Sequence, residues 1–397
     1  MNSKQKIEKS LNLENIDENV VTLEWWGMYK YEFADLDYKK AMFNDGKSLV
    51  PVYKNFYNYF KPDWFHLNIG APKYFKDAEI IKEKGEDFIV FQDRYISLKE
   101  EDKYFSVESN TKKEKIIDIP DYIIKSKKDR PKVDLSNKSK IDEYVKRFVW
   151  IDYNQIIKLG YTDHVEEIVK EFGDDLFINV HIPSEICEIL DPFTGYVGFE
   201  EGLVAFYDFP DGMKYLIEKC YEAQLEWVKA YKKAGAHGFN ISEDNMAADS
   251  ISPDTYRKFL KPIHIDFFKE VKNIGLYPLL TFWGDINPLL NDIKQIGISG
   301  LAIEESRKNF TLDVVKIMKI VGDKVCLFGN IDSIKTLLQG TQEDIHREIY
   351  RQREAKKYGN SIFQNGSPIT PGTPKDNISE FVSFSRKINF KADRWDF

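Results

Sequence analysis

The sequence predicts an α/β protein: a (β/α)₈ barrel with an N-terminal antiparallel β-hairpin insertion. From residue 142 onward, short β-prone runs alternate with helical segments in five or six successive units, and this alternation requires a parallel sheet. The helical segments end close to glycines, which favour the left-handed conformation that closes a helix. A doubly wound sheet would show the same alternation. However, no Gly-x-Gly-x-x-Gly follows a strand and no Gly-x-x-x-x-Gly-Lys-Ser/Thr occurs, so we favour the barrel.

The first predicted elements precede this regular part. Residues 3–13 form a short polar helix, and β-prone runs at 20–27 and 63–68 predict two strands. Residues 87–134 hold short β runs between charge-rich turns, which predict the hairpin insertion, covering one face of the barrel. A lysine-rich stretch at 125–140 is expected to be a solvated connection. We treat residues 1–397 as a single domain.

In the regular part, each helix is followed by a strand. The predicted helices are 162–172, 211–234, 263–273, 286–295, 311–320 and 341–358. The predicted strands are 176–181, 238–242, 277–282, 300–303, 325–328 and 361–364. In a barrel, chemistry gathers at the carboxyl ends of the strands. Those ends form a polar and mostly acidic set: Glu24, His66, His181, Glu243, Asp244, Trp283, Asp285, Glu304, Glu305, Asn330, Asp332 and Ser367.

Composition excludes several classes of protein. Hydrophobic residues make up 42% of the chain, which supplies a core that a disordered chain lacks. The net charge of −8 provides no basic field, so nucleic acid is not the expected ligand. Three distant cysteines fit neither a disulfide framework nor a clustered zinc site, and they indicate a reducing cytoplasm. We also find no secretory leader and no apolar stretch long enough to span a membrane.

Four stretches occur in an order that is typical of one family. They are Gly235-Ala236-His237-Gly238 leading to Ser242-Glu243-Asp244, the run from Ile251 to Pro262, Phe328-Gly329-Asn330-Ile331-Asp332-Ser333 with Leu338-Gln339-Gly340-Thr341, and Asn365 to Ile378. Together they resemble the uroporphyrinogen decarboxylase superfamily, over roughly residues 150–390. This resemblance implies a (β/α)₈ barrel. It also implies one of two activities, since the superfamily contains cofactor-free porphyrin decarboxylases and methyltransferases that work with corrinoid proteins.

Two branches of the superfamily fit this chain less well. True decarboxylases carry two arginines near the N-terminus, whereas residues 1–93 contain no arginine. A polyanionic porphyrin requires planar, bidentate donors, which lysine does not replace well. Zinc-dependent thiol methyltransferases carry a His-x-Cys-Gly and a further cysteine. Thr281, Trp283 and Ser367 stand at those positions, so the thiolate-rich zinc site is missing.

The methyltransferases of anaerobic O-demethylase systems are more similar. That branch implies zinc held by two glutamates and a histidine, with twenty residues between the second glutamate and the histidine, as between Glu243 and His264. Val228 stands where the first glutamate is expected, and Glu226 lies nearby with a different helical phase. We call the end of the barrel formed by the carboxyl ends of the strands the mouth. The third ligand remains open among three acidic residues there: Glu304, which we prefer, Glu305 and Asp285. No Asp-x-His-x-x-Gly motif occurs, so the corrinoid is expected on a separate partner protein.

These considerations lead to a set of candidate site residues. We predict catalytic roles for Glu243, Asp244 and His181, substrate contacts for Trp26, His66, Trp283 and Asn330, and metal binding by Glu243, His264 and Glu304. Each has a structural alternative. The histidines can be packing residues, the acidic pair can cap the next helix, and Asn330 can brace a loop. Only one of Trp25 and Trp26 can face inward, because neighbours in a strand point to opposite faces.

The leading hypothesis is a methyltransferase that moves a methyl group from a small methylated, methoxy-type substrate to a separate corrinoid protein. A cofactor-free decarboxylase, in which a cavity carboxylate such as Asp244 stabilises protonated intermediates, is the second hypothesis. A barrel that has lost its chemistry and binds a ligand or partner protein is the third. The sequence is compatible with a homodimer and does not identify the substrate.

Overall fold

Seven parallel strands form the central sheet of the protein. The structure is a computed structural model and describes residues 1–25, 29, 46–68, 79–83, 86–91, 94–101, 104–109, 131–191, 195–307 and 309–388. The strand order across the sheet is β1-β6-β7-β8-β9-β10-β11. The strands are β1 Trp64–Leu67, β6 Phe177–Pro183, β7 Gly238–Glu243, β8 Tyr277–Phe282, β9 Gly300–Ile303, β10 Cys326–Phe328 and β11 Ser361–Ile362. Neighbours in the sheet follow one another along the chain, as the alternating pattern predicts.

Residues 20–22 join the two edges of this sheet. Val21 forms a parallel bridge with Phe363, next to β11, and the backbone N–H of Thr22 donates to the carbonyl of Phe363 at 2.9 Å. On the other side, the carbonyl of Val21 accepts from the backbone N–H of Asp63, next to β1, at 2.9 Å. The strand predicted at 20–27 is therefore a short bridging segment in the described residues. It links both edges of a curved sheet that resembles a (β/α)₈ barrel.

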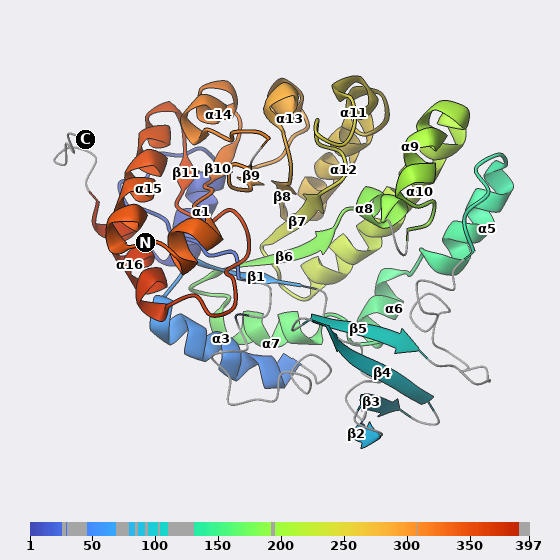
Figure 1. The fold of residues 1–397 in the computed structure, drawn as a ribbon, viewed down its shortest axis with the longest axis horizontal. Helices are drawn as coiled ribbons and strands as arrows, with labels where there is room; N and C mark the ends of the chain where they lie inside the picture. The colour runs from blue at the N-terminus through green and yellow to red at the C-terminus, as the bar shows by residue number, and fades with distance from the viewer. Residues whose placement is uncertain are drawn as a thin grey trace.

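Helices surround this sheet (Figure 1). Those that precede or connect the strands from β6 onward are α7 Asp163–Phe172, α8 Glu185–Leu190, α9 Phe199–Asp208, α10 Pro210–Lys233, α11 Pro253–Phe259, α12 Lys261–Ile274, α13 Leu290–Ile293, α14 Val314–Val321 and α15 Gln342–Ala355. The remaining α-helices described are α1 Ser3–Leu11, α3 Gly46–Phe60, α5 Lys138–Phe148, α6 Tyr153–Lys158 and α16 Lys375–Lys387. Shorter helical turns span Asn287–Leu289, Ser333–Leu338 and Lys356–Tyr358.

Glycines end two of the long helices in the way the sequence predicts. Gly235 follows α10 with a φ of 91°, and Gly275 follows α12 with a φ of 93°. Residues with a Cβ rarely adopt this left-handed conformation, whereas glycine adopts it readily. The chain therefore turns directly from each helix into the next strand.

Two apolar clusters pack on opposite faces of the sheet. The larger cluster lies between the strands and the surrounding helices and includes Phe65, Ile178 and Leu280. The smaller cluster contains residues at alternate strand positions, among them Trp64 and Phe177, together with Ile7 and Leu11 of α1. Since alternate residues of a strand point to opposite faces, the smaller cluster fills the barrel interior. Helix α1 packs against its amino-terminal end.

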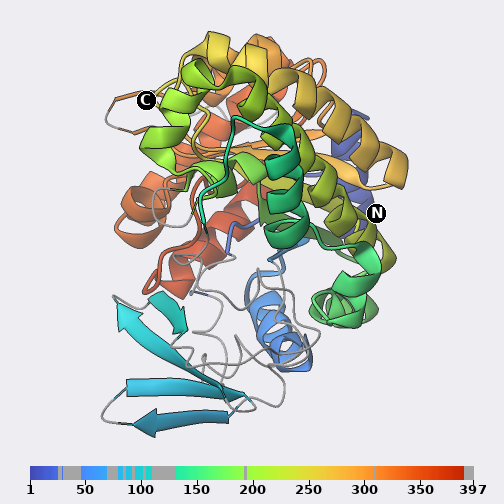
Figure 2. The ribbon, with the colours of Figure 1, turned by 90° about the vertical axis from the view of Figure 1, so that its right-hand side faces the viewer.

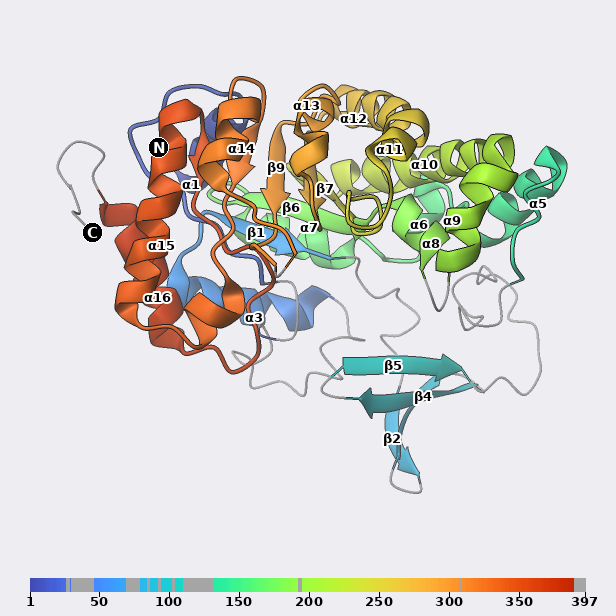
Figure 3. The same ribbon diagram turned by 45° about the horizontal axis from the view of Figure 1, so that its top comes forward.

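A second, four-stranded antiparallel sheet lies within the region where the insertion was predicted. Its strands are β2 Glu79–Glu83, β3 Glu86–Phe91, β4 Arg94–Glu101 and β5 Tyr104–Ser109, in the order β2-β3-β4-β5. The sheet begins eight residues before the predicted boundary at 87 and has more strands than one hairpin. Figures 2 and 3 show it apart from the seven-stranded sheet, so it does not cover the barrel as predicted. Residues 110–130 of the predicted insertion lie outside the described residues.

The lysine-rich connection predicted at 125–140 ends earlier than expected. Helix α5 begins at Lys138, and the side chain of Asn137 caps it by accepting from the backbone N–H of Ser139. Elsewhere, Cys187, Cys220 and Cys326 are buried free thiols, which agrees with the absence of a disulfide framework. Within the described part of the chain, no helix combines the length and apolar character needed to cross a membrane.

Candidate functional site

The barrel interior changes from apolar to polar toward the carboxyl ends of the strands. Two positions after an apolar interior residue, most strands carry a polar one. The pairs are Trp64 and His66, Phe177 and Asn179, Leu279 and Thr281, Ala302 and Glu304, Phe328 and Asn330, and Ile362 and Gln364. Residues two apart in a strand share a face, so the polar members form a layer above the apolar one. This is the end of a barrel where catalytic residues gather.

Glu24, His66 and His181 form the first group in this layer. The Oε2 atom of Glu24 lies 2.7 Å from Nδ1 of His66, and both side chains are buried. The rings of His66 and His181 meet edge to face, with centroids 4.7 Å apart. Burial raises the pKa of Glu24 well above its ordinary value. Burial, and secondarily His66, lowers the pKa of His181, which keeps that ring neutral.

Glu243 and His264 form the second group, at the end of β7 and near the start of α12. Nε2 of His264 lies 2.9 Å from Oε1 of Glu243, and both side chains are fully buried. The hydroxyl of Tyr221 donates to the same oxygen at 2.8 Å and lies 3.0 Å from Nε2. The hydroxyl of Tyr256 lies 3.2 Å from Nδ1. The contact that the sequence spacing suggests is therefore present, and two tyrosines enclose the histidine.

Asp244 follows Glu243 and lies closer to solvent. Its backbone N–H points to the sulfur of Cys187 at 3.4 Å, and that thiol points to the carbonyl of Ser242 at 3.3 Å. Desolvation of the carboxyl group, and secondarily the charge of Glu243, raises the pKa of Asp244 to about 6, although the residue as a whole remains exposed. A carboxyl group with this pKa can both release and accept a proton near neutral pH.

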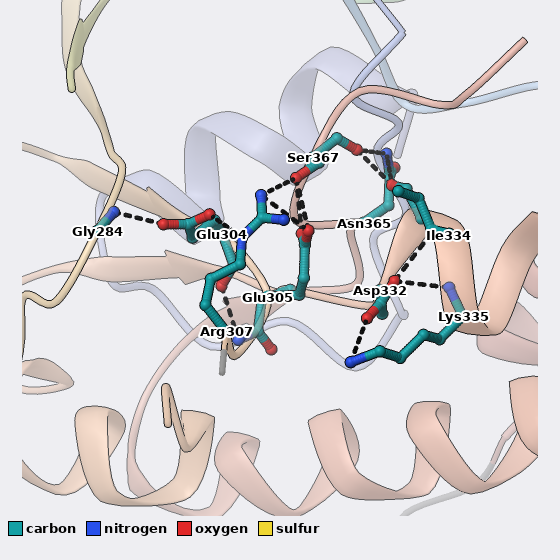
Figure 4. Close-up of polar contacts among 11 residues, drawn as sticks. Gly284, Glu304, Glu305, Arg307, Asp332, Ile334, Lys335, Asn365 and Ser367 are labelled. Carbon is teal, nitrogen blue, oxygen red and sulfur yellow. Dashed lines mark hydrogen bonds and ion pairs between the residues drawn. The ribbon is translucent and has the colours of Figure 1, made fainter. Parts of the chain in front are cut away.

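Glu304 and Glu305 form an acidic pair that is clamped by Arg307 (Figure 4). Nε of Arg307 donates to Oε2 of Glu304 at 2.6 Å, and its Nη2 lies 3.1 Å from Oε1 of Glu305. Oε1 of Glu304 also accepts from the backbone N–H of Gly284 at 2.5 Å. The hydroxyl of Ser367 donates to Glu305 at 2.7 Å. Burial raises the pKa of Glu305.

Asn330 braces the loops beside this clamp. Its Nδ2 donates to the carbonyls of Glu304 and Leu312, both at 3.0 Å, and its Oδ1 accepts from Arg351 at 2.9 Å. These bonds correspond to the structural alternative for this residue, while its contact with substrate stays a prediction. A cavity of about 640 Å³ lies next to it, lined by Glu305, Asn330, Arg351 and others.

The tryptophans of the predicted site take different places. Trp25 is buried in the core and stacks on Phe56, with ring centroids 3.5 Å apart. Trp26 lies outside the described residues. Trp283 is half-buried, and its backbone N–H donates to the carbonyl of Glu243 at 2.9 Å, which places it at the mouth.

The predicted zinc ligand set does not assemble in the described structure. A catalytic zinc needs three protein ligands. Of the predicted ligands in the described structure, Glu243 contacts His264 but not Glu304. Glu304 is bonded to Gly284 and Arg307 instead. No group of three or more His, Cys, Asp or Glu side chains in the described ranges is arranged to hold a metal ion. The residues present therefore do not fit the predicted metal site.

Sequence reasoning missed several residues that shape this region. Glu24 was noted as a strand end without a role, and Tyr221, Tyr256 and Arg307 were not considered. Arg307 stands three residues after Glu304, a spacing that brings side chains close in a tight turn. No comparable sequence signal marks the tyrosines, because their contact with His264 depends on how three elements pack.

Comparison with known proteins shows which proteins this chain is similar to. Residues 194–388 match the family model described as "Uroporphyrinogen decarboxylase (URO-D)". A "Methylcobamide:CoM methyltransferase MtaA" of Methanosarcina barkeri is 32% identical over 162 residues, which cover 41% of this chain and 45% of the relative. A "Uroporphyrinogen decarboxylase" of Chlorobium luteolum is 29% identical over 190 residues, 47% of this chain and 52% of the relative. The chain thus spans about half the length of the curated relatives it matches.

A solved structure supports the fold over nearly the whole chain. A "methyltransferase from Methanosarcina mazei" superposes with a TM-score of 0.67 at 19% sequence identity. The superposition covers 96% of this chain and 98% of the solved one. At this identity the likeness concerns the fold, and it agrees with the barrel architecture that the alternating pattern predicts.

Proposed function

Residues 194–388 match the uroporphyrinogen decarboxylase family model, and from this resemblance we propose that the protein is a methyltransferase. It moves a methyl group from a small methylated, methoxy-type compound to a corrinoid carried by a separate protein. The acidic strand-end layer binds the substrate. The relatives named for methylcobamide and methylated-thiol chemistry support the reaction class. Because other relatives are named as decarboxylases, decarboxylation is the competing reaction that an experiment must exclude.

The bonding of the arginines at the mouth favours the methyltransferase over the decarboxylase. A polycarboxylate substrate requires guanidinium groups that are available to bind it. In the described structure, Arg307 is bonded to Glu304 and Glu305, and Arg351 is bonded to Glu348 and Asn330. The surrounding carboxylates repel further negative charge. A small substrate with little negative charge therefore suits this mouth better than a porphyrinogen does.

The candidate residues take definite roles in this proposal. Trp283 offers an aromatic surface at the mouth, against which a flat methoxylated ring can pack. Asp244 exchanges protons near neutral pH, because desolvation raises its pKa to about 6. His66 and His181 contact the substrate from the barrel interior. Glu243 and His264 form a buried pair that supports the end of β7. No step is assigned to zinc, since the described side chains do not form a three-ligand site.

A methyl-transfer assay tests the proposal. Purified protein is incubated with reduced free cob(I)alamin and, separately, with 2-methoxyphenol, a methylamine, dimethyl sulfide or trimethylsulfonium as methyl donor. We expect formation of methylcobalamin with at least one donor, followed by its visible spectrum. Replacing Asp244 by Asn should lower that rate by about 10²- to 10⁴-fold, the range typical of a lost proton-transfer group.

A matched control and a competing assay complete the design. Glu226 is a buried carboxylate on α10 whose described bonds are to Lys229 and to the backbone N–H of Tyr153 at the start of α6, at 3.0 Å, and not to the mouth residues. The Glu226→Gln variant should transfer methyl groups at the wild-type rate. If the protein releases CO₂ from uroporphyrinogen and transfers a methyl group from no donor, the methyltransferase proposal is wrong and the protein is a decarboxylase.

A further inference from the structure

Two buried asparagines lie on adjacent strands in the polar layer of the barrel interior. Asn179 on β6 is 0% exposed and Asn240 on β7 is 1% exposed. Asn179 pairs in register with Gly238, which shares a face of β7 with Asn240. A Cβ on Gly238 would lie 3.1 Å from Oδ1 of Asn179, so this oxygen lies over β7. The two amides are therefore diagonal neighbours, which the tilt of barrel strands brings to a similar height.

Three of the four polar atoms of these amides lack a hydrogen-bond partner within the described part of the chain. They are Oδ1 and Nδ2 of Asn179 and Oδ1 of Asn240. The fourth, Nδ2 of Asn240, donates to the hydroxyl oxygen of Thr281 at 2.8 Å, so this hydroxyl keeps its own proton to donate. Buried amides in native proteins are nearly always bonded to a protein group, an ordered water or a ligand. Three unmet atoms in the layer where barrels bind substrates therefore indicate a polar group of a ligand.

The donors and acceptors that remain define the chemical group that fits. The two Oδ1 atoms need hydrogen donors, whereas Nδ2 of Asn179 and the hydroxyl of Thr281 need an acceptor. A primary carboxamide supplies two N–H groups and one carbonyl oxygen with two lone pairs. A carboxylate has no hydrogen to donate, and a hydroxyl group has a single one. A water molecule offers the same count as the carboxamide, so the experiment must distinguish a ligand from ordered water.

We propose that Asn179 and Asn240 form a subsite for a neutral carboxamide group of the methyl donor. This inference rests on the proposed methyl transfer and narrows its substrate to a methylated compound that also carries such a group. The carbonyl oxygen of the ligand accepts from Nδ2 of Asn179 and from Thr281, while its two N–H groups donate to the two Oδ1 atoms. These side chains bind and orient the donor and take no part in breaking the bond to its methyl group.

Titration calorimetry with two ligands of nearly equal shape tests the subsite without any methyl transfer. 2-Methoxybenzamide and 2-methoxyacetophenone share a methoxy group and a carbonyl group, and they differ in carrying an NH₂ or a CH₃ group. The amide should bind at least about tenfold more tightly, because the ketone leaves both buried Oδ1 atoms without a donor. If the amide does not bind, or binds only as well as the ketone, ordered water alone meets these atoms and the proposal is overturned.

The Asn179→Leu variant separates recognition from folding. Leu is similar in size and has no polar atoms, so the substitution removes two unmet atoms from the interior. The urea midpoint of the ligand-free protein should therefore stay the same or rise. In the same variant the amide and the ketone should bind within about threefold of each other. A preference for the amide that survives this substitution would overturn the proposal.

Asn377, on α16 outside the barrel interior, provides a matched control. Its Nδ2 donates to the carbonyls of Leu337 and Gly340, at 2.9 and 3.2 Å. Because these bonds are made within the protein, Asn377→Leu should lower the urea midpoint. It should leave the preference for the amide over the ketone unchanged.

The methyl-transfer assay shows how the subsite and the proposed function depend on each other. Methyl transfer from 2-methoxybenzamide should have a kcat/KM at least about tenfold higher than transfer from 2-methoxyacetophenone. If no donor is demethylated while the amide still binds more tightly than the ketone, the subsite is retained and the proposed function fails. If 2-methoxyphenol is demethylated while the amide and the ketone bind equally, the proposed function is retained and the subsite fails.

Discussion

Acid should destabilise this protein through His237, at the start of β7. The backbone N–H of Ile178 donates to Nδ1 of His237 at 2.9 Å, so the folded state needs a neutral ring. Burial, and secondarily Lys4 and Lys232, lowers the pKa of His237 from 6.5 to about 3. Between these values the unfolded chain binds a proton that the folded protein does not. The free energy of unfolding therefore falls as the pH falls.

The size of this effect follows from the shift. Each pH unit below 6.5 removes about 1.4 kcal/mol, until the folded protein also binds the proton near pH 3. At pH 5 the loss is 1.5 units, or about 2 kcal/mol. Asn can still accept a hydrogen bond from Ile178 but does not titrate. The His237→Asn variant should therefore lose about 2 kcal/mol less than the wild type between pH 7 and pH 5.

Urea unfolding at both pH values measures this difference. The wild type and His237→Asn share every other titrating group, so subtracting the two pH dependences isolates His237. A variant that gains this acid tolerance would confirm the reasoning. If both proteins lose the same free energy between pH 7 and pH 5, the ring of His237 is not held neutral and the argument is wrong.

Three further perturbations probe the mouth. Arg307→Ala leaves the clamped carboxylates without a counter-charge, and it should cost about 1–3 kcal/mol at pH 7 in urea unfolding. The loss should become smaller as the pH falls, because burial raises the pKa of Glu305 and its protonation removes part of the unpaired charge, so a pH-independent loss would contradict the clamp. In Gly366→Ala, the new Cβ would lie 2.5 Å from the backbone nitrogen of Glu305, so methyl transfer should fall at least tenfold. A rate within twofold of the wild type would show that the loop moves to accommodate the methyl group. Tyr256→Phe removes one hydrogen bond to His264 and should lower the unfolding free energy by about 1 kcal/mol; an unchanged melting temperature would refute that bond.

The regular part of the fold could be predicted because its signals are local. β-prone runs bounded by glycines such as Gly235 and Gly275 locate the strands from β6 onward within a few residues. The same reasoning does not locate α3 Gly46–Phe60, whose sequence is rich in aromatic residues and carries Pro51 inside the helix. The start of α5 at Lys138 did carry a signal, the cap residue Asn137, which the lysine-rich composition obscured.

The site was predictable only where sequence spacing determines position. The spacing from Glu243 to His264 correctly suggested a contact, because a strand end and the first turn of a following helix lie at one end of a barrel. Glu304 does not join this contact, and its role as a metal ligand stays a prediction. Its short contact with Arg307 depends on the conformation of the loop after β9, which no periodicity reveals. Charge pairing within a loop therefore determines where Glu304 points, and sequence patterns do not reveal it.

The bridging segment at residues 20–22 has a consequence for how the chain folds. Val21 pairs with Phe363, more than three hundred residues later, and the same segment bonds to Asp63. Contacts between such distant positions are slow to form, since the ordering of a long loop precedes the gain. During synthesis the N-terminal segment must wait, partly unpaired, until Phe363 has left the ribosome. Closure of the ring is therefore expected to be a late step of folding.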